Sequence, residues 1–198
     1  MMQESFWSVL LVTIFVACVV YVLDSWYAKQ WLTVERKTIS YIAAALLIGI
    51  FGEVFTETIY NFLVHQPLWH YQFLPVHQSY TSLYSVILWA MYGVHLYWAR
   101  VAIDTRYGRI SKWKLATVFA IESLILETFL NLVWLGAFGY LIYFYTPTDL
   151  WHVTTIQNIP CYFAASWAII GTVKRFNKDP LFFLIMALLL LTVFLLFP

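Results

Sequence analysis

Three glutamates lie inside stretches that are apolar enough to cross a membrane. Glu53 and Glu57 fall in GEVFTETIYNFLVH (residues 52–65), and Glu127 opens ETFLNLVW (residues 127–134). An ionisable residue inside the bilayer is energetically costly, normally faces the interior of a helix bundle, and is a candidate functional residue by default. A buried carboxyl group can also hold a proton near neutral pH and transfer it. These three residues are therefore the candidate catalytic acids and bases.

A structural role is the alternative for each of these carboxyl groups. In a protonated form they would hydrogen-bond to hydroxyl and amide side chains, such as those of Asn61 and Asn131, and hold the helices together. Glu57 and Glu127 share a repeated motif, which favours a functional role for both. For Glu53 the two interpretations stay open.

The spacing of the polar residues indicates that the helices carrying them have one polar side. In residues 49–61 and 78–95, polar and small side chains recur at steps of three and four, which places them on one helical face. Shorter polar faces occur near residues 127 and 157. Four such helices imply a polar cavity inside the membrane, capped by the aromatic outer loop 67–75. The candidate substrate-binding residues are Asn61, Asn131, Tyr60, Gln78, Trp89, Tyr92, Trp69 and Gln157.

The composition is that of an integral membrane protein. Of the 198 residues, 63% are hydrophobic and 11% are charged, which leaves too few charged side chains to hydrate the surface of a soluble domain. The net charge of +1 provides no basic face for nucleic acid, so we expect no such partner. We expect a single all-α transmembrane domain over residues 1–198.

Six segments are long enough to cross about 30 Å of hydrocarbon as helices. They are residues 5–24, 38–64, 77–99, 115–140, 156–173 and 180–197. All 11 Lys and Arg residues follow the first, third or fifth segment, and the loops on the other side have none. Because cytoplasmic loops collect basic residues, we expect both termini outside the cytoplasm. The short loops and the consistent charge bias favour the inner membrane of a bacterial cell.

A short internal similarity predicts a duplicated core. ETIYNFLV resembles ETFLNLVW, which aligns Glu57 with Glu127 and Asn61 with Asn131 at an offset of 70 residues. Segments two and three would then repeat as segments four and five, in halves of about 38–99 and 115–173 with the same orientation. Parallel repeats are related by an axis along the membrane normal, so the two similar elements would face each other across it. Chance similarity is the alternative.

The histidines do not form a recognisable metal-binding motif. His65, His70 and His77 bracket the outer loop, but their spacing matches none of the common ligand signatures. We therefore expect no metal and no cofactor. His95 is expected to be a hydrogen-bonded core residue, and Glu122 is expected to be structural because it lies on a different helical face from the other acids.

Aromatic residues make up 20% of the chain, more than membrane interfaces alone require. Because aromatic faces stabilise positive charge, a buried acid with aromatic walls suits protonation of an alkene or epoxide and guidance of the resulting carbocation. Residues 50–90 place an acid late in a span before an aromatic LWHY turn and a proline, and so resemble the small integral-membrane terpene and lycopene cyclases. The resemblance implies substrate protonation by an intramembrane acid, at the position of Glu57. The chain lacks the Pro-x-Glu-Glu element typical of lycopene cyclases, so no second family acid is assigned.

The sequence thus predicts an integral-membrane enzyme that performs acid/base chemistry on an isoprenoid or another lipophilic substrate, as cyclases and isomerases do. One alternative is a proton- or cation-coupled transporter or channel, in which the same acids bind ions. Segments two to four have no interior proline, which disfavours the broken helices typical of transporters. The other alternative is a membrane subunit that binds a lipid or pigment. The expected partners are a lipophilic small molecule and membrane lipid.

Overall fold

A computed structural model describes residues 6–176 and 180–196 of the chain. Most of these residues are helical, which confirms the mostly helical fold expected from the sequence. The helices are α1 (Phe6–Ala28), α2 (Arg36–Val64), α3 (Ser85–Tyr107), α4 (Lys112–Phe138), α5 (Ile159–Phe176) and α6 (Pro180–Leu196). Two long loops contain the short elements β1 (Trp69–Tyr71), β2 (Pro75–Val76), β3 (Thr81–Ser82), β4 (Tyr143–Tyr145) and the 3-10 helix η1 (Ile156–Asn158).

Four of the described helices, α1 to α4, are long and apolar enough to cross a membrane. The helix α6 is also apolar but has only 17 residues, and α5 has 18. A chain with several such helices is a membrane protein by their length and composition.

The third helix begins later than the sequence predicts. Hydropathy places the start of this span at residue 77, whereas α3 starts at Ser85. The backbones of His77, Gln78 and Ser79 are left-handed, with φ of 48°, 57° and 67°, and cannot continue a right-handed helix. The polar residues just before α3 therefore lie in a loop, and β3 pairs with β2 there.

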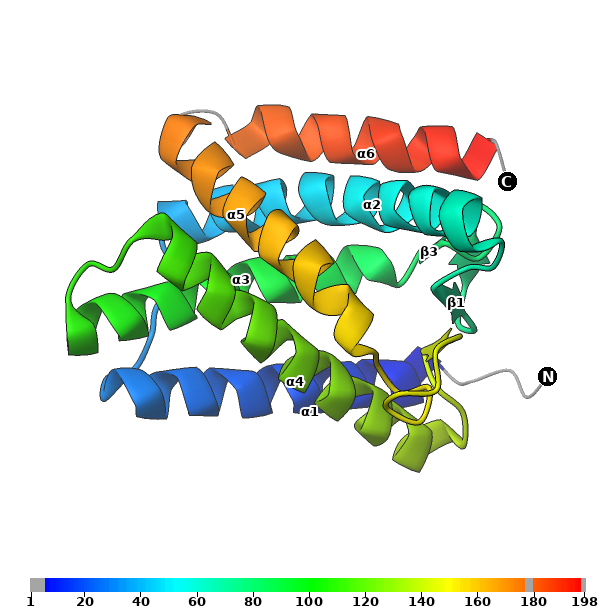
Figure 1. Ribbon diagram of the computed structural model, residues 1–198. Helices are drawn as coiled ribbons and strands as arrows, with labels where there is room; N and C mark the ends of the chain where they lie inside the picture. Colours follow the sequence, from blue (N-terminus) through cyan, green and yellow to red (C-terminus); the bar gives the residue numbers. More distant parts are fainter. Residues whose placement is uncertain (1–5, 177–179, 197–198) are drawn as a thin grey trace.

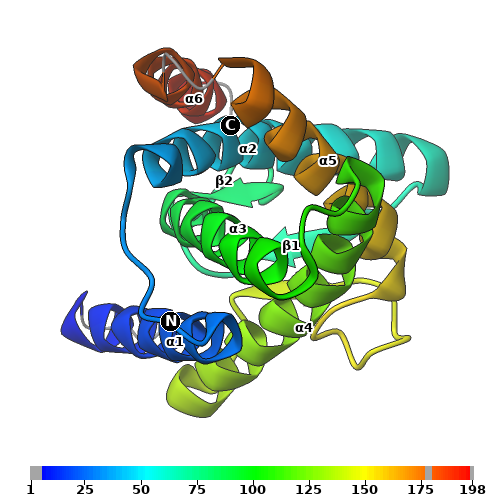
Figure 2. The same ribbon diagram turned by 90° about the vertical axis from the view of Figure 1, so that its left-hand side faces the viewer.

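The helices form one bundle with the strands gathered at one end. In Figure 1, α1, α2, α3 and α6 run roughly along the same line, whereas α4 and α5 cross them obliquely. The strands lie at the end where α1 begins and α6 ends, and the α1–α2 and α3–α4 connections lie at the other end. Figure 2, viewed from that other end, shows α3 surrounded by α1, α2, α4 and α5. The helix α6 packs on the outside of α2 and buries only Phe183 and Ala187, so most of its apolar surface faces outward.

The strands β1 and β4 join the two long loops. They pair antiparallel in the register Trp69–Tyr145, His70–Phe144 and Tyr71–Tyr143. Two further backbone bonds flank the ladder: Gln72 donates to the carbonyl of Ile142 at 2.8 Å, and Thr146 donates to the carbonyl of Leu68 at 2.9 Å. Side chains alternate along a strand, and the four aromatic residues at the ends of β1 and β4 are all buried.

Two glycines allow α2 and α3 to approach closely. A Cβ atom on Gly93 would lie 2.6 Å from the Cα atom of Ile42, which is backbone and cannot turn aside. A Cβ atom on Gly49 would lie 2.0 Å from the ring of Trp89. The absence of a side chain at Gly49 lets the Trp89 ring lie against α2, where its indole N–H bonds Glu53.

Candidate functional site

A cavity of about 300 Å³ lies between the helices and the β1–β4 ladder. Residues of α1 to α5 and of both ladder strands line it, and most of its surface is apolar. The lining includes Glu53 on α2 and Glu127 on α4, whereas none of the described residues that line it is Lys or Arg. Its volume is at the lower end of the range for small-molecule sites, roughly 300 to 1,000 Å³.

Glu53 is buried and accepts hydrogen bonds from three side chains. Tyr71 of β1 donates its hydroxyl to Oε1, and Thr81 of β3 donates its hydroxyl to Oε2. The indole N–H of Trp89 on α3 donates to Oε1 at 2.9 Å. The carboxyl group is therefore held by a ladder strand, the following loop and a neighbouring helix.

Glu127 has closely similar surroundings on α4. Tyr145 of β4 donates its hydroxyl to Oε1, and Thr154 donates its hydroxyl to Oε2 at 2.5 Å. The amide of Asn158 in turn donates to the hydroxyl oxygen of Tyr145 at 2.8 Å. A tyrosine from the ladder and a threonine from the loop after it thus hold each of the two cavity carboxyl groups.

The two sets of contacts are separated by a constant distance along the chain. Each glutamate bonds a tyrosine 18 residues later and a threonine 27 or 28 residues later. An offset of 74 residues relates Glu53 to Glu127, and the central ladder pair His70–Phe144 has the same offset. The similarity found in the sequence aligned Glu57 with Glu127 at an offset of 70, and these contacts do not support that alignment.

Glu57 holds the loop before β1 and is not among the residues lining the cavity. Its side chain is fully buried, and its two carboxylate oxygens accept the backbone N–H groups of Leu68 at 2.9 Å and Trp69 at 2.6 Å. Asn131 on α4 lies 74 residues after Glu57 and makes a similar contact: its Oδ1 accepts the backbone N–H of Ile142 at 3.1 Å. Glu57 and Asn131 therefore each fix the loop that leads into a ladder strand.

The ladder tyrosines form the polar edge of an aromatic wall. Burial raises the pKa of Tyr71, Tyr143 and Tyr145 well above the ordinary value, and the neighbouring glutamates raise each pKa further. These hydroxyls consequently stay neutral and remain hydrogen-bond donors. The Tyr143 ring packs edge-on against both other rings, with centroid distances of 5.3 Å to Tyr71 and 5.9 Å to Tyr145.

The predicted substrate-binding residues divide into two groups. Trp69, Trp89 and Tyr92 line the cavity. The remaining five are not among its lining residues: Asn61, Asn131, Tyr60, Gln78 and Gln157. Several of these five connect loops, since Asn61 donates to the Tyr80 hydroxyl and Tyr60 donates to Gln157, both at 2.8 Å.

The sequence reasoning did not assign the four hydroxyl partners of the glutamates, Tyr71, Thr81, Tyr145 and Thr154. A signal for them exists in the equal spacing from each glutamate to its tyrosine. A second signal is the C-cap of each helix, because His65 and Gly139 are both left-handed, with φ of 60° and 79°, and are also 74 residues apart. These equivalences relate residues of different type, so a search for identical residues does not find them.

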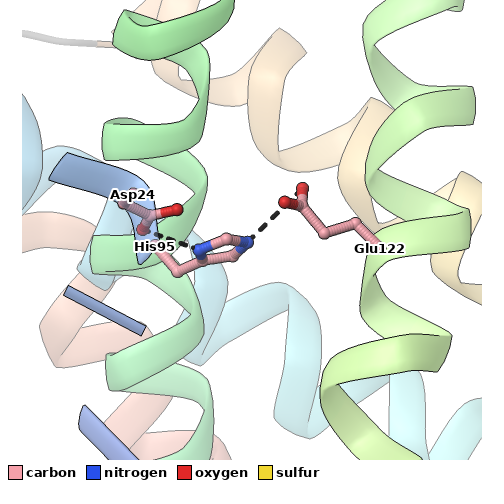
Figure 3. A group of neighbouring side chains, drawn as sticks. All are labelled: Asp24, His95 and Glu122. Atoms are coloured by element: carbon pink, nitrogen blue, oxygen red, sulfur yellow. Dashed lines mark hydrogen bonds and ion pairs between the residues drawn. The ribbon is translucent and has the colours of Figure 1, made fainter. Parts of the chain in front are cut away.

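A second polar cluster joins α1, α3 and α4. The buried imidazole of His95 lies between two carboxyl groups, with Nδ1 2.9 Å from Oδ2 of Asp24 and Nε2 3.4 Å from Oε2 of Glu122 (Figure 3). His95 also lines the cavity. The expectation of a buried, hydrogen-bonded His95 is met, and Glu122 belongs to the same cluster. Asp24 was missed because α1 shows no polar face in the sequence.

The chain matches no family model, no curated protein and no solved structure. The similarity of residues 50–90 to terpene and lycopene cyclases therefore stays a prediction. The site itself offers two hydrogen-bonded carboxyl groups on the wall of one apolar, aromatic cavity.

Proposed function

We propose that the chain is an integral-membrane enzyme that transfers protons to and from an apolar, isoprenoid-like substrate in this cavity. Glu53 and Glu127 are its acid/base pair. The observation that carries the proposal is the presence of two buried carboxyl groups, from different helices, in the lining of one apolar cavity. Intramembrane carboxyl groups are costly, and a place beside a cavity gives each of them a reacting partner.

The lining favours a substrate without anionic groups. A phosphate or diphosphate substrate needs Lys, Arg or a metal ion to compensate its charge, and the described lining contains neither Lys nor Arg. Positive charge is accommodated well, because Trp69, Trp89 and several tyrosine rings line the cavity together with the carboxyl groups. Protonation of a carbon–carbon double bond or an epoxide, followed by loss of a proton elsewhere, suits this lining.

Both carboxyl groups are held by donors that stabilise the carboxylate form. Tyr71, Thr81 and Trp89 donate to Glu53, and Tyr145 and Thr154 donate to Glu127, beside which Tyr143 and Tyr162 also lie. One carboxyl group gives a proton to the substrate, and the other accepts the proton that the substrate loses. The neutral ladder tyrosines Tyr71 and Tyr145 keep both groups oriented.

The same proposal includes the arrangement in the membrane. We infer that α5 and α6 also cross the membrane, which gives six spans with α1 to α4. Both termini then lie outside the cytoplasm of a bacterial cell, because every Lys and Arg follows the first, third or fifth segment. We also infer a parallel duplication that relates residues 38–99 to 115–173, now at an offset of 74. The recurrence of the glutamate–tyrosine–threonine contacts supports it.

Hydrogen exchange in D2O tests the proposed chemistry. Lipids that copurify with the protein are identified by mass spectrometry, and the apolar fraction is incubated with protein in D2O. We expect an isoprenoid that gains one deuterium with wild-type protein and none with Glu53→Gln or Glu127→Gln. Asp104→Asn, on the partly exposed surface of α3, is the control that retains exchange. Equal exchange in the two glutamine variants and the wild type would remove the proposal.

A proton- or cation-coupled transporter is the second candidate. It is favoured by the equivalent carboxyl sites in the two halves, which is the arrangement that parallel repeats give to a transport site. The protein is reconstituted into vesicles, a pH gradient is imposed across the vesicle membrane, and the movement of protons and cations is measured. A transporter carries them across the membrane, whereas an enzyme does not.

A further inference from the structure

We propose that His95 and Glu122 bind a divalent first-row metal ion such as Zn²⁺, while Asp24 orients the imidazole of His95. The site is distinct from the Glu53/Glu127 pair and does not depend on the proposed function. Its residues come from α1, α3 and α4, and Figure 3 shows the imidazole lying between the two carboxyl groups.

The hydrogen bond at Nδ1 of His95 determines whether the other ring nitrogen, Nε2, carries a proton in the neutral imidazole. Asp24 accepts from Nδ1 at 2.9 Å, so in the neutral imidazole the proton lies on Nδ1 and Nε2 carries a lone pair. That lone pair faces Oε2 of Glu122, which is also an acceptor. Two acceptors that face each other need either a proton or a metal ion between them, and the distance between them separates these two cases. A carboxylate that holds Nδ1–H is also the usual partner of a metal-binding histidine.

The distance between these two acceptors fits a metal ion better than a direct bond. Bonds of about 2.1 Å from zinc to nitrogen and oxygen, at a tetrahedral angle, place the two ligand atoms about 3.4 Å apart. Nε2 and Oε2 are 3.4 Å apart, which matches this separation. A charge-assisted hydrogen bond would be about 2.7 to 2.9 Å long. Both atoms are buried and have no hydrogen-bond partner among the described residues.

The net charge of the cluster also favours a divalent metal ion. Two carboxylates and a neutral imidazole carry −2, which one divalent ion balances completely, whereas a protonated imidazole would leave a net charge of −1. No described Lys or Arg side chain forms an ion pair with Asp24 or Glu122. Asp24 and His95 are only 7% and 4% exposed, and buried charges require compensation. A nitrogen ligand with carboxylate oxygens is a donor set that suits zinc and its neighbours.

Zinc binding to purified protein tests the site. Wild-type protein in detergent is treated with a chelator, dialysed, and titrated with ZnCl2 by calorimetry. We expect one zinc per chain and a rise in melting temperature on zinc addition. His95→Gln and Glu122→Gln should abolish both effects, and Asp24→Asn should weaken binding by about 10- to 100-fold because it orients the ligand without holding the metal. His70→Gln, at an exposed histidine of β1, and Asp104→Asn are the matched controls that keep wild-type binding.

The wild-type protein alone decides the question if the site variants do not fold. X-ray absorption at the zinc edge should then show one imidazole nitrogen together with oxygen ligands at about 2.0 to 2.2 Å. The proposal is overturned if wild-type protein takes up no stoichiometric zinc, if zinc does not raise its melting temperature, or if the bound zinc has two or more imidazoles, which would indicate surface histidines. Unchanged zinc binding by a folded His95→Gln variant would overturn it equally.

Discussion

Replacing Glu57 by glutamine should cost the protein stability. Both oxygens of the carboxylate accept backbone N–H groups, from Leu68 at 2.9 Å and Trp69 at 2.6 Å, in a fully buried position. Glutamine has the same size but offers one oxygen, so its NH2 group must face one of these N–H groups. A buried donor left without an acceptor costs about 1 to 3 kcal/mol, and loss of the charge from the remaining bond costs about 1 kcal/mol more. We expect Glu57→Gln to lower the free energy of unfolding by about 2 to 4 kcal/mol.

The matched variant is Glu53→Gln, one helical turn earlier. Two of its three partners are hydroxyl groups, those of Tyr71 and Thr81, which can rotate to accept from the new NH2 group. Glu53→Gln should therefore lower the free energy of unfolding by about 1 kcal/mol or less. Unfolding in detergent, followed by tryptophan fluorescence against denaturant, compares the two variants with the wild type. If Glu57→Gln unfolds at the wild-type midpoint, or if Glu53→Gln loses as much stability, the assignment of Glu57 to the loop backbone is wrong.

Three further predictions follow from the packing and the ladder. Gly93→Ala should cost about 1 to 3 kcal/mol, since the new Cβ meets the backbone of Ile42, whereas Gly136→Ala on the exposed face of α4 should be neutral or slightly stabilising in the same denaturant assay. Tyr71→Phe should cost about 1.5 to 3 kcal/mol because it removes one hydrogen bond to a buried carboxyl group, and Tyr145→Phe should cost about 1 kcal/mol more because it also leaves the buried Asn158 amide without its acceptor; an equal or smaller loss for Tyr145→Phe would argue against this reading. The raised pKa of the three ladder tyrosines keeps them neutral in the folded state while unfolded tyrosines ionise near pH 10, so stability is fully present below that pH and falls as the pH rises above it. Absorbance at alkaline pH should show these tyrosines ionising only when the protein unfolds.

Local properties of the chain explain what the sequence could predict. The existence and approximate place of the helices follow from runs of apolar residues, since a span needs only length and hydropathy. The polar face of α2 follows from helical spacing, and it brings Glu53 to the cavity as well as Glu57 to the loop. Spacing alone could not separate these two residues, because they differ by one turn and lie on nearly the same side of the helix.

Contacts between distant residues explain what the sequence could not predict. The pairing of β1 with β4 joins loops that are 74 residues apart, and neither strand has more than three residues. The late start of α3 depends on left-handed residues such as His77 and Ser79, which hydropathy does not detect. The carboxyl partners Tyr71 and Tyr145 are set by this loop geometry and not by any helical period.

The offset of 70 found in the sequence differs from the offset of 74 in the contacts for a physical reason as well. Matching identical residues aligns Glu57 with Glu127. In the structure Glu57 corresponds to Asn131, because each accepts a backbone N–H group of the loop that follows its helix. A carboxylate and an amide oxygen both accept a backbone N–H, so selection for the contact does not preserve the residue type. His65 and Gly139 show the same effect at the helix ends, where each adopts the left-handed conformation. Under the proposed duplication, the geometry of these contacts is better preserved than the residue identity.

The ladder gives the two cavity carboxyl groups a shared mechanical support. Its register is symmetric about the His70–Phe144 pair, so Tyr71 and Tyr145 stand at equivalent positions on opposite strands. Tyr71 bonds Glu53 and Tyr145 bonds Glu127, while the neighbour of each tyrosine on the same strand, Trp69 or Tyr143, also lines the cavity. A movement of one strand consequently displaces the partners of both glutamates together. Under the proposed function, an acid and a base that act on one substrate gain from this arrangement, because the short backbone ladder fixes the partners that orient both of them.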